Sequence, residues 1–204
     1  MNKTCVIVGA GEVSEREIRV DDGDYVIAAD GGLKYLSDRG IKADMVLGDF
    51  DSLGYVPDHN NRILHPAEKD DSDMMLAVKE GLQLGRDRFR IYGALGGRPD
   101  HTIANLQTLI YLAKQGAAGE LIGDGVHITA IHNGAVRLGS EHKGYISVFC
   151  LSGAATGVWI KGLKYSMEDG VLTSDRPLGL SNEFVGTESE IGVREGELVI
   201  LWYQ

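Results

Sequence analysis

The spacing of short apolar runs most strongly limits what this chain of 204 residues can fold into. Across residues 1–124 these runs are apolar at successive positions, are bounded by Gly or Asp, and alternate with amphipathic stretches. Runs of this kind are typical of parallel strands that helices cover on both faces. The predicted strands are Thr4–Val8, Tyr25–Ala29, Met45–Leu47, Arg62–Leu64, Phe89–Tyr92 and Glu120–Ile122, and the predicted helices are Gly32–Asp38, Ser72–Leu84 and Thr102–Lys114. Residues 1–124 are therefore predicted to form a doubly wound, mostly parallel α/β sheet.

The pattern changes after Gly125. Residues 125–204 contain short runs of alternating character that are separated by Gly, Asp and Asn, and they contain no credible helix. The pair Asn133-Gly134, between HITAIH and AVRL, predicts a tight hairpin. Strands at this spacing predict an antiparallel β-sandwich. The chain is thus expected to consist of an α/β domain, 1–124, and a β-sandwich domain, 125–204.

Composition excludes some partners. A hydrophobic content of 43% and a charged content of 25% are those of a soluble globular protein. The net charge of −10 argues against a basic surface for a nucleic-acid polymer, although a metal ion can bring a single nucleotide to an acidic site. No apolar run is long enough to cross a membrane, and the start MNKTCVIVGAG does not resemble a cleavable leader. Cys5 and Cys150 lie in strand-like runs without metal-ligand spacing, which favours buried free thiols and a reducing cytoplasm.

Three short acidic motifs carry the candidate chemistry: GDFDS at Gly48–Ser52, EKDDSD at Glu68–Asp73 and GGRPDH at Gly96–His101. Mg²⁺ prefers hard oxygen ligands, usually one or two carboxylates together with waters and substrate phosphates. Clustered aspartates repel one another and repel phosphate, so a cation would stabilise them. Each motif alone also fits a turn or a helix cap, but the three together favour a site for Mg²⁺ and a polyphosphate.

GDFDS directly follows a predicted strand, so Asp49 and Asp51 lie at the edge of the sheet where α/β folds bind ligands. Alternate positions of an extended segment point the same way, so both carboxylates can approach one metal, or one can orient the other. For Asp51 a turn that bonds its own backbone is the competing interpretation.

In the second motif, Asp70 and Asp73 are one helical turn apart at the start of the helix Ser72–Leu84. Ser72 or Asp71 is the expected N-cap, and capping is the preferred role of Asp71. Lys69 fits a phosphate contact and a neutralising partner for its acidic neighbours equally well.

The third motif is predicted to be a glycine turn that leads into a helix N-terminus, a place where backbone N–H groups bind anions. Arg98 can clamp phosphate oxygens, and Asp100 can hold the metal or accept a proton from an alcohol. His101 is more often a hydrogen-bonded scaffold residue than a catalyst.

A competing pattern lies at the front of the chain. VIVGAGEVS, with Asp30 about twenty residues further on, imitates a dinucleotide fingerprint. Ser14 stands where the third glycine belongs, so the match is poor. Gly9, Gly11 and Asp30-Gly31-Gly32 are instead expected to line a nucleotide crevice.

In the β region, Trp159 and Trp202 are predicted to be core or interface residues. The triplet Ser181-Asn182-Glu183 is polar between apolar neighbours. It fits either a turn or a set of hydrogen-bonding groups for a polar heterocycle.

The ordered set of motifs resembles that of the bacterial thiamine pyrophosphokinases. The resemblance covers nearly the whole chain, from ADGG at Ala29–Gly32 through GDFDS, EKDDSD and GGRPDHTIANL to the late SNEF. Each motif alone is unspecific, whereas the order is highly specific. One departure is modest: Ser72 stands where the family more often has Thr, and either hydroxyl can cap a helix.

The resemblance implies an α/β catalytic domain, a C-terminal thiamine-binding β-sandwich and a homodimer. It also implies Mg²⁺-dependent transfer of the β,γ-pyrophosphoryl group of ATP to the thiamine hydroxyl, giving thiamine diphosphate and AMP. The implied metal ligands are Asp49, Asp51, Asp70, Asp73 and Asp100, with Asp73 or Asp100 as the proton acceptor. The implied nucleotide contacts are Asp30, Gly31, Gly96, Gly97, Arg98 and Asn105, and the implied thiamine contacts are Ser181 and Asn182.

Two other functions remain open from the sequence. Pyrophosphoryl transfer to another heterocyclic alcohol, such as a hydroxymethyl pterin, would keep the donor site and change only the acceptor pocket. A catalytically silent regulator that binds a nucleotide or thiamine would not need five intact carboxylates.

Overall fold

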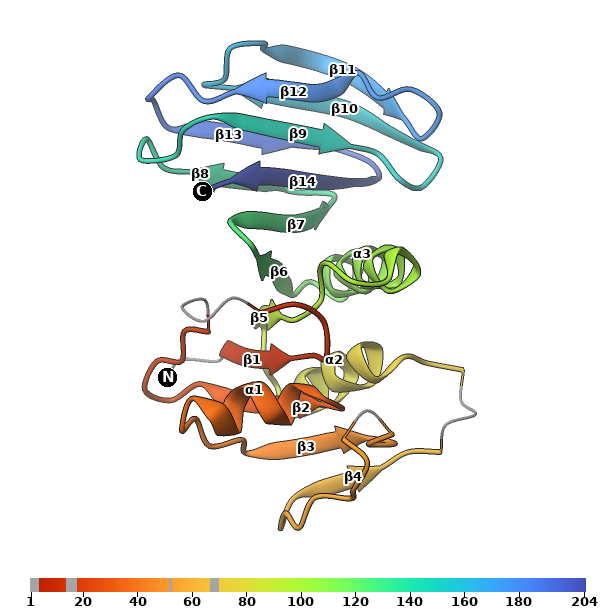
Figure 1. Cartoon of the computed structure of the whole chain (residues 1–204). Coiled ribbons are helices and arrows are strands. Elements are labelled where there is room, and N and C mark those ends of the chain that lie inside the picture. The colour runs from red at the N-terminus through yellow and green to blue at the C-terminus, as the bar shows by residue number, and fades with distance from the viewer. Residues whose placement is uncertain (1–3, 14–17, 52, 67–69) are drawn as a thin grey trace. The chain divides into compact units, whose positions relative to one another are not determined.

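The computed structural model describes residues 4–13, 18–51, 53–66 and 70–204 (Figure 1). By its internal contacts the chain divides into two compact units. The first unit comprises Met1–Thr108 and Gly119–Asp124, and the second comprises Leu109–Ala118 and Gly125–Gln204. The helix α3 (Pro99–Lys114) therefore contributes residues to both units.

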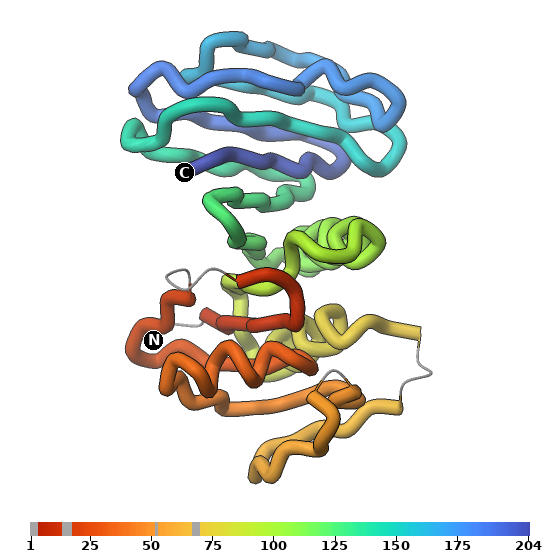
Figure 2. The backbone as a smooth tube through the Cα atoms, in the orientation of Figure 1, coloured from red at the N-terminus to blue at the C-terminus, as the bar shows by residue number. Residues whose placement is uncertain are grey.

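The first unit is built on a sheet in the order β6-β5-β1-β2-β3-β4. The pairs β5–β1, β1–β2, β2–β3 and β3–β4 are parallel. The strands are β1 (Thr4–Val8), β2 (Tyr25–Ala29), β3 (Met45–Gly48), β4 (Arg62–Leu64), β5 (Arg88–Tyr92) and β6 (Ala118–Gly123). Figure 2 shows β1 in red beside the yellow-green β5, which follows it much later in the chain.

Helices cover both faces of this sheet, as the sequence predicts. Figure 1 shows α1 (Gly32–Asp38) on one side and α2 (Asp73–Gln83) on the other. Alternate residues of β1 serve the two faces: Val6 and Val8 pack in a cluster with Leu36 of α1. On the other face Gly81 of α2 lies so close to the sheet that a Cβ there would stand 2.5 Å from the Phe89 ring. The strand order reverses direction at β1, and right-handed crossovers then place the two helices on opposite faces.

Helix and cysteine predictions are confirmed with small shifts. Ser72 is the N-cap of α2, and its Oγ accepts a hydrogen bond from the Met75 N–H at 3.2 Å. The helix α3 begins at Pro99 and not at Thr102, since proline is favoured in the first helical turn. Cys5 and Cys150 are buried free thiols, and burial raises the pKa of Cys5 to about 12. Within the described residues no helix is long and apolar enough to cross a membrane.

The second unit contains two antiparallel sheets that enclose one apolar core. Their orders are β12-β9-β14-β7 and β11-β10-β13-β8. Ile146 and Ile200 from the first sheet pack with Ile160 and Ile191 from the second. The strands are β7 (Val126–His132), β8 (Ala135–Leu138), β9 (Tyr145–Phe149), β10 (Ala154–Lys161), β11 (Met167–Thr173), β12 (Gly179–Glu183), β13 (Ser189–Gly192) and β14 (Glu197–Tyr203). This arrangement confirms the predicted sandwich.

The predicted hairpin at Asn133-Gly134 is wrong. β7 pairs along its length with β14, and β8 pairs with β13, so the turn carries the chain from one sheet to the other. Asn133 has the expected left-handed φ of 46°, but its side-chain Oδ1 accepts a hydrogen bond from Gly196 N–H at 2.9 Å. The local turn preference was correct, and the long-range strand pairing decided the partner.

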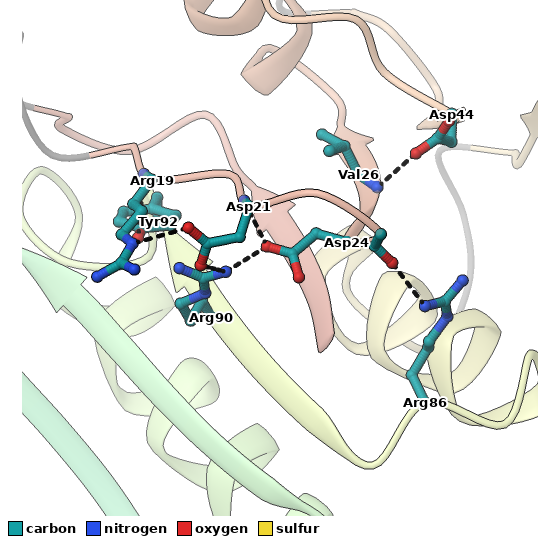
Figure 3. Close-up of polar contacts among 9 residues, drawn as sticks. Arg19, Asp21, Asp24, Val26, Asp44, Arg86, Arg90 and Tyr92 are labelled. Atoms are coloured by element: carbon teal, nitrogen blue, oxygen red, sulfur yellow. Dashed lines mark hydrogen bonds and ion pairs between the residues drawn. The ribbon is translucent and has the colours of Figure 1, made fainter. Parts of the chain in front are cut away.

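A cluster of paired charges lies beside the amino ends of the parallel strands (Figure 3). We call Arg19, Asp21, Asp24 and Arg90 the amino-end cluster. Asp21 accepts from Arg19 Nε and Arg90 Nη2, each at 3.1 Å. Arg90 also pairs with Asp24, whose side chain is 0% exposed. These contacts link the segment that leads into β2 to β5, which lies on the other side of β1.

Candidate active site

A cavity of about 490 Å³ lies at the carboxyl ends of β1, β2 and β5 in the first unit. Its wall is formed by the turns after these strands and by the first turns of α2 and α3. The lining residues are Gly9, Ala10, Gly11, Ala29, Asp30, Ser72, Asp73, Met74, Gly93, Ala94, Gly96, Gly97, Arg98, His101, Ala104 and Asn105. The chain leaves β1 for β2 on one side and later returns to β5 on the other. Ligands of open α/β sheets bind at such a reversal of the strand order.

Glycines bring two of these turns into direct contact. Gly9 N–H donates to the Tyr92 carbonyl at 2.8 Å, and Gly11 N–H donates to the Gly93 carbonyl at 2.9 Å. A Cβ on Gly9 would stand 2.8 Å from the Gly93 carbonyl oxygen, so only glycine fits. The expectation that Gly9 and Gly11 line a crevice is consistent with this geometry.

Asn105 holds the turn after β5 from the side of α3. Asn105 is 6% exposed, and its side-chain Nδ2 donates a hydrogen bond to the Ala94 carbonyl at 2.7 Å. This bond fixes the segment that contains Gly96 and Gly97, whose φ values of 76° and 62° are left-handed. A direct nucleotide contact of Asn105 stays a prediction, and the bond to Ala94 gives it a positioning role.

Asp30 ends β2 in a left-handed conformation with φ of 49°. Its N–H donates to the Leu47 carbonyl at 2.8 Å, which ties it to β3. Asp30 lines the cavity, and its buried Oδ1 has no hydrogen-bond partner among the described residues. Gly31 is the N-cap of α1 and lies outside the lining.

Among the described residues of the second motif, 70–73, Ser72 and Asp73 line the cavity. The Ser72 cap places Asp73 at the first position of α2, facing the same space as Asp30. Asp71 is not the cap; it pairs with Lys79 at 2.5 Å. Asp70 is exposed outside the lining, and Glu68 and Lys69 lie outside the described residues.

Asp49 and Asp51 follow β3 at the same edge of the sheet but do not line the cavity. Asp49 Oδ1 accepts a hydrogen bond from the Asp51 N–H at 3.1 Å, which is the local turn bond of an aspartate. Ser52 lies outside the described residues. The two aspartates therefore follow a strand that neighbours β2 and Asp30, and they form no metal-binding group of three or more side chains within the described residues.

Arg98 and Asp100 form a two-pronged ion pair at the start of α3. Arg98 Nε and Nη2 donate to Asp100 Oδ1 and Oδ2 at 3.2 and 2.6 Å. The hydrogen bond from Arg98 is the main cause that lowers the pKa of Asp100. Arg98 and the exposed His101 line the cavity, whereas Asp100 lies outside the lining. Asp100 is thus ionised at neutral pH and is a weak base while Arg98 holds it.

The described residues hold no group of three or more His, Cys, Asp or Glu side chains that could bind a metal. The carboxylates in the cavity wall are Asp30 and Asp73. Since Mg²⁺ needs only one or two carboxylates when phosphates and waters complete its shell, this donor set fits an ion that arrives with a polyphosphate. It does not fit a metal held by the protein alone.

The predicted thiamine contacts differ from each other. Ser181 is exposed, with a left-handed φ of 59°. Asn182 is 4% exposed, and its Oδ1 accepts from the N–H groups of Tyr165 and Glu183, each at 2.9 Å. Its Nδ2 donates to the Tyr165 carbonyl at 2.7 Å. In this structure the Asn182 side chain therefore clamps two backbone segments.

The two tryptophans have packing roles in the second unit. Trp202 is buried in the core and stacks on His127 at 5.4 Å. Trp159 Nε1 donates to Glu190 Oε1 at 2.7 Å.

Sequence reasoning missed several apolar lining residues, namely Met74, Ala94 and Ala104. They carry no chemical signature. The signal that could have found them is their position: after β5, in the first turn of α2, or in the second turn of α3.

Comparison with known proteins assigns the family. Residues 18–119 match the family model described as thiamin pyrophosphokinase, catalytic domain, and residues 135–198 match the model described as thiamin pyrophosphokinase, vitamin B1 binding domain. The chain is 30% identical to the thiamine pyrophosphokinase of Bacillus subtilis over 98% of each sequence. The crystal structure of a thiamine pyrophosphokinase from Bacillus subtilis superposes with a TM-score of 0.87 at 26% identity, covering 98% of this chain and 99% of that one. That of a thiamin pyrophosphokinase from Geobacillus thermodenitrificans, at 23% identity and a TM-score of 0.82 over 98% and 97%, shares the fold. The chain belongs to the thiamine pyrophosphokinase family, whose enzymes transfer the β,γ-pyrophosphoryl group of ATP to the hydroxyl of thiamine to give thiamine diphosphate and AMP, and it is an enzyme of this activity.

Proposed function

We propose that the cavity of the first unit binds ATP, with its phosphates at the turn Gly96-Gly97 and at Arg98. The observation that carries this proposal is a left-handed glycine turn, followed by an arginine and a helix N-terminus, in the wall of a cavity at the strand reversal. Backbone N–H groups and the positive end of the helix dipole favour an anion there. Asp30, Gly31 and Asn105 would lie on the nucleotide side of the same site.

Mg²⁺ is the cofactor that suits this donor set. Asp73 from the cavity wall would hold it together with the phosphates. The other proposed ligands are Asp49, Asp51, Asp70 and Asp100. When bound, the ion neutralises charge on the transferring pyrophosphoryl group.

The reaction needs positioning and charge stabilisation more than covalent help from the protein. The thiamine oxygen bonds to the β-phosphorus, the bond from this phosphorus to the bridging oxygen of the α-phosphate breaks, and AMP leaves with that oxygen. A carboxylate accepts the hydroxyl proton. Asp73 and Asp100 are the proposed acceptors, and Asp100 can act so only after Arg98 turns from it to phosphate.

The domain 125–204 would bind thiamine through Ser181 and Asn182 and would form the homodimer. Ser181 is free to meet a ligand, whereas Asn182 contributes by shaping the segment around it. Tyr145 and Tyr203, on neighbouring strands of one sheet, are 56% and 52% exposed. A second copy of the chain would cover such a face, and a molar mass in solution of one chain, 22.1 kDa, would contradict the dimer. The two free thiols suit a cytoplasmic location.

The decisive experiment incubates the protein with thiamine, ATP and Mg²⁺ and separates the nucleotides. We expect AMP and thiamine diphosphate in equal amounts, and we expect a chelator to stop the reaction. ADP with thiamine monophosphate would contradict the β-phosphorus assignment. Turnover of a hydroxymethyl pterin in place of thiamine would reassign the acceptor pocket, and binding of thiamine and ATP without turnover would indicate a regulator.

A further inference from the structure

One carboxylate oxygen of Asp30, Oδ1, lacks a hydrogen-bond donor among the described residues. This oxygen is buried, and Asp30 is one of the residues that line the cavity. Leaving a buried polar atom unpaired destabilises the fold by about 1–3 kcal/mol, and more for a charged group. A structure accepts this cost most readily where a ligand supplies the donor.

Among the described residues, the neighbours of Asp30 differ between its two sides. On the side of β3, the Gly48 backbone is so near that a Cβ there would stand 3.2 Å from the Asp30 Cβ. On the cavity side, Asp30 shares the wall with small residues such as Gly9, Gly11 and Ala29. An occupant of the cavity can therefore supply the donor that the described residues do not.

The position of Asp30 in the sheet indicates which part of a nucleotide it would meet. Asp30 follows β2, whereas Gly96, Gly97 and Arg98 follow β5, and β1 lies between these two strands. Two strand spacings amount to roughly 10 Å. Phosphates near Arg98 would therefore leave the nucleoside to extend toward Asp30, and its hydroxyl groups are donors.

We infer that Asp30 recognises the ribose 2′- and 3′-hydroxyls of the donor nucleotide and makes this enzyme selective for ribonucleotides over deoxyribonucleotides. The inference rests on the proposed nucleotide site. Two adjacent hydroxyls present two donors that one carboxylate can accept. In dinucleotide-binding folds an acidic residue after the second strand likewise binds the ribose, although the phosphates lie there at the glycine turn after the first strand.

The test compares ATP, 2′-deoxyATP and 3′-deoxyATP as donors. We expect wild-type kcat/KM to fall by about 10- to 100-fold for a deoxynucleotide, the range of a hydrogen bond to a charged group. Asp30→Asn keeps the left-handed backbone accessible and removes the charge. It should therefore lower kcat/KM for ATP and reduce the ratio of kcat/KM for ATP to that for the deoxynucleotides at least about fivefold. Asp73→Asn is the matched control, because it removes another carboxylate of the same wall and should slow all three donors equally.

A binding measurement without added metal separates ribose recognition from metal binding. Titration of the wild type with AMP and 2′-deoxyAMP should show a preference for AMP that Asp30→Asn loses. Equal use of ATP and 2′-deoxyATP by the wild type would overturn the inference. An equal loss of kcat/KM for ATP and 2′-deoxyATP in Asp30→Asn would also overturn it. Inosine triphosphate, which differs from ATP only in the base, serves as a further donor: if Asp30→Asn changed kcat/KM for this donor alone, Asp30 would contact the base and not the ribose. Failure to form AMP from ATP would refute the proposed function, whereas the AMP titration would still test Asp30.

Discussion

The two ends of the parallel sheet carry similar charges but use them differently. In the amino-end cluster each carboxylate is paired with an arginine, and the Asp24 side chain is fully buried beside Arg90. At the carboxyl ends, Asp30 Oδ1 is unpaired among the described residues, and the ion pair of Arg98 and Asp100 is largely exposed. The same residue types thus pair with one another at the amino ends, which we call the closed end, and are left available to a ligand at the carboxyl ends, which we call the open end.

This contrast follows from the direction of the chain. In a parallel sheet the N-termini of the following helices face the carboxyl ends of the strands, so unpaired N–H groups and positive dipole ends gather there. An anion is stabilised at that end, whereas charges at the amino ends must neutralise one another. A charged residue that is paired at the amino ends is therefore interpreted as structural, and one that lacks a partner at the carboxyl ends is interpreted as a candidate ligand contact.

The largest expected effect is on stability, at the closed end. Asp24→Ala leaves Arg90 buried without its nearest partner, and breaking a buried pair typically costs about 3–5 kcal/mol. We expect the free energy of unfolding in urea to fall by that amount. Arg19→Ala, which removes only an exposed partner of Asp21, should cost no more than about 1 kcal/mol. If both variants lose equally little, the amino-end cluster is not the closed structural element described above.

The next effect is on turnover, at the open end. Asp100→Asn removes an exposed charge whose hydrogen-bond donors, among the described residues, are Arg98 and the His101 N–H. We expect kcat to fall by about 10²–10³, as for other preorganised electrostatic groups, while the free energy of unfolding changes by less than about 0.5 kcal/mol. The control is Asp71→Asn, which loses only the ion pair with Lys79 and should keep nearly full activity. Activity of Asp100→Asn within a few-fold of wild type would return Asp100 to a helix-terminus role.

Local features of the fold were predictable. Apolar runs gave β1 and β2 with the bounds that the structure has, since buried parallel strands need no information from distant residues. The bounds of the more exposed edge strand β4 were also predicted. The cap at Ser72 was predictable for the same reason: a hydroxyl that precedes a helix finds its donor three residues on.

Features that depend on distant partners were not predictable. Asn133-Gly134 formed the expected turn, but β14 and β13 decided which strands it joins. The bonds of the Asn182 amide to the Tyr165 backbone were not predictable from its polar segment, whereas its contact with thiamine stays a prediction. In the cavity, the sequence identified Asp30 and Arg98, whereas Met74 and Ala104 became visible only through the fold.

The smallest effect extends the contrast to the second unit and depends on pH. Glu197 is a buried and fully paired charge, like Asp24. Its side chain is 10% exposed, its Oε1 lies 2.5 Å from Lys114 Nζ, and Ser152 Oγ donates to its Oε2. Burial alone would raise the pKa of Glu197, but the hydrogen bonds from Lys114 and Ser152 outweigh burial and lower it. A folded pKa below the unfolded one stabilises the protein above the unfolded value, about 4.3, and this contribution is lost as the pH falls through the folded pKa. Glu197→Gln should therefore lower the free energy of unfolding by about 1–3 kcal/mol at pH 7, and the difference from wild type should shrink below about pH 4. Urea unfolding at pH 7 and below about pH 4 measures this difference in the free energy of unfolding. Glu188→Gln, at an exposed position, is the control and should leave the free energy of unfolding unchanged at both pH values. A difference that stays constant with pH would mean that packing around Glu197, and not its paired charge, stabilises this part of the sandwich.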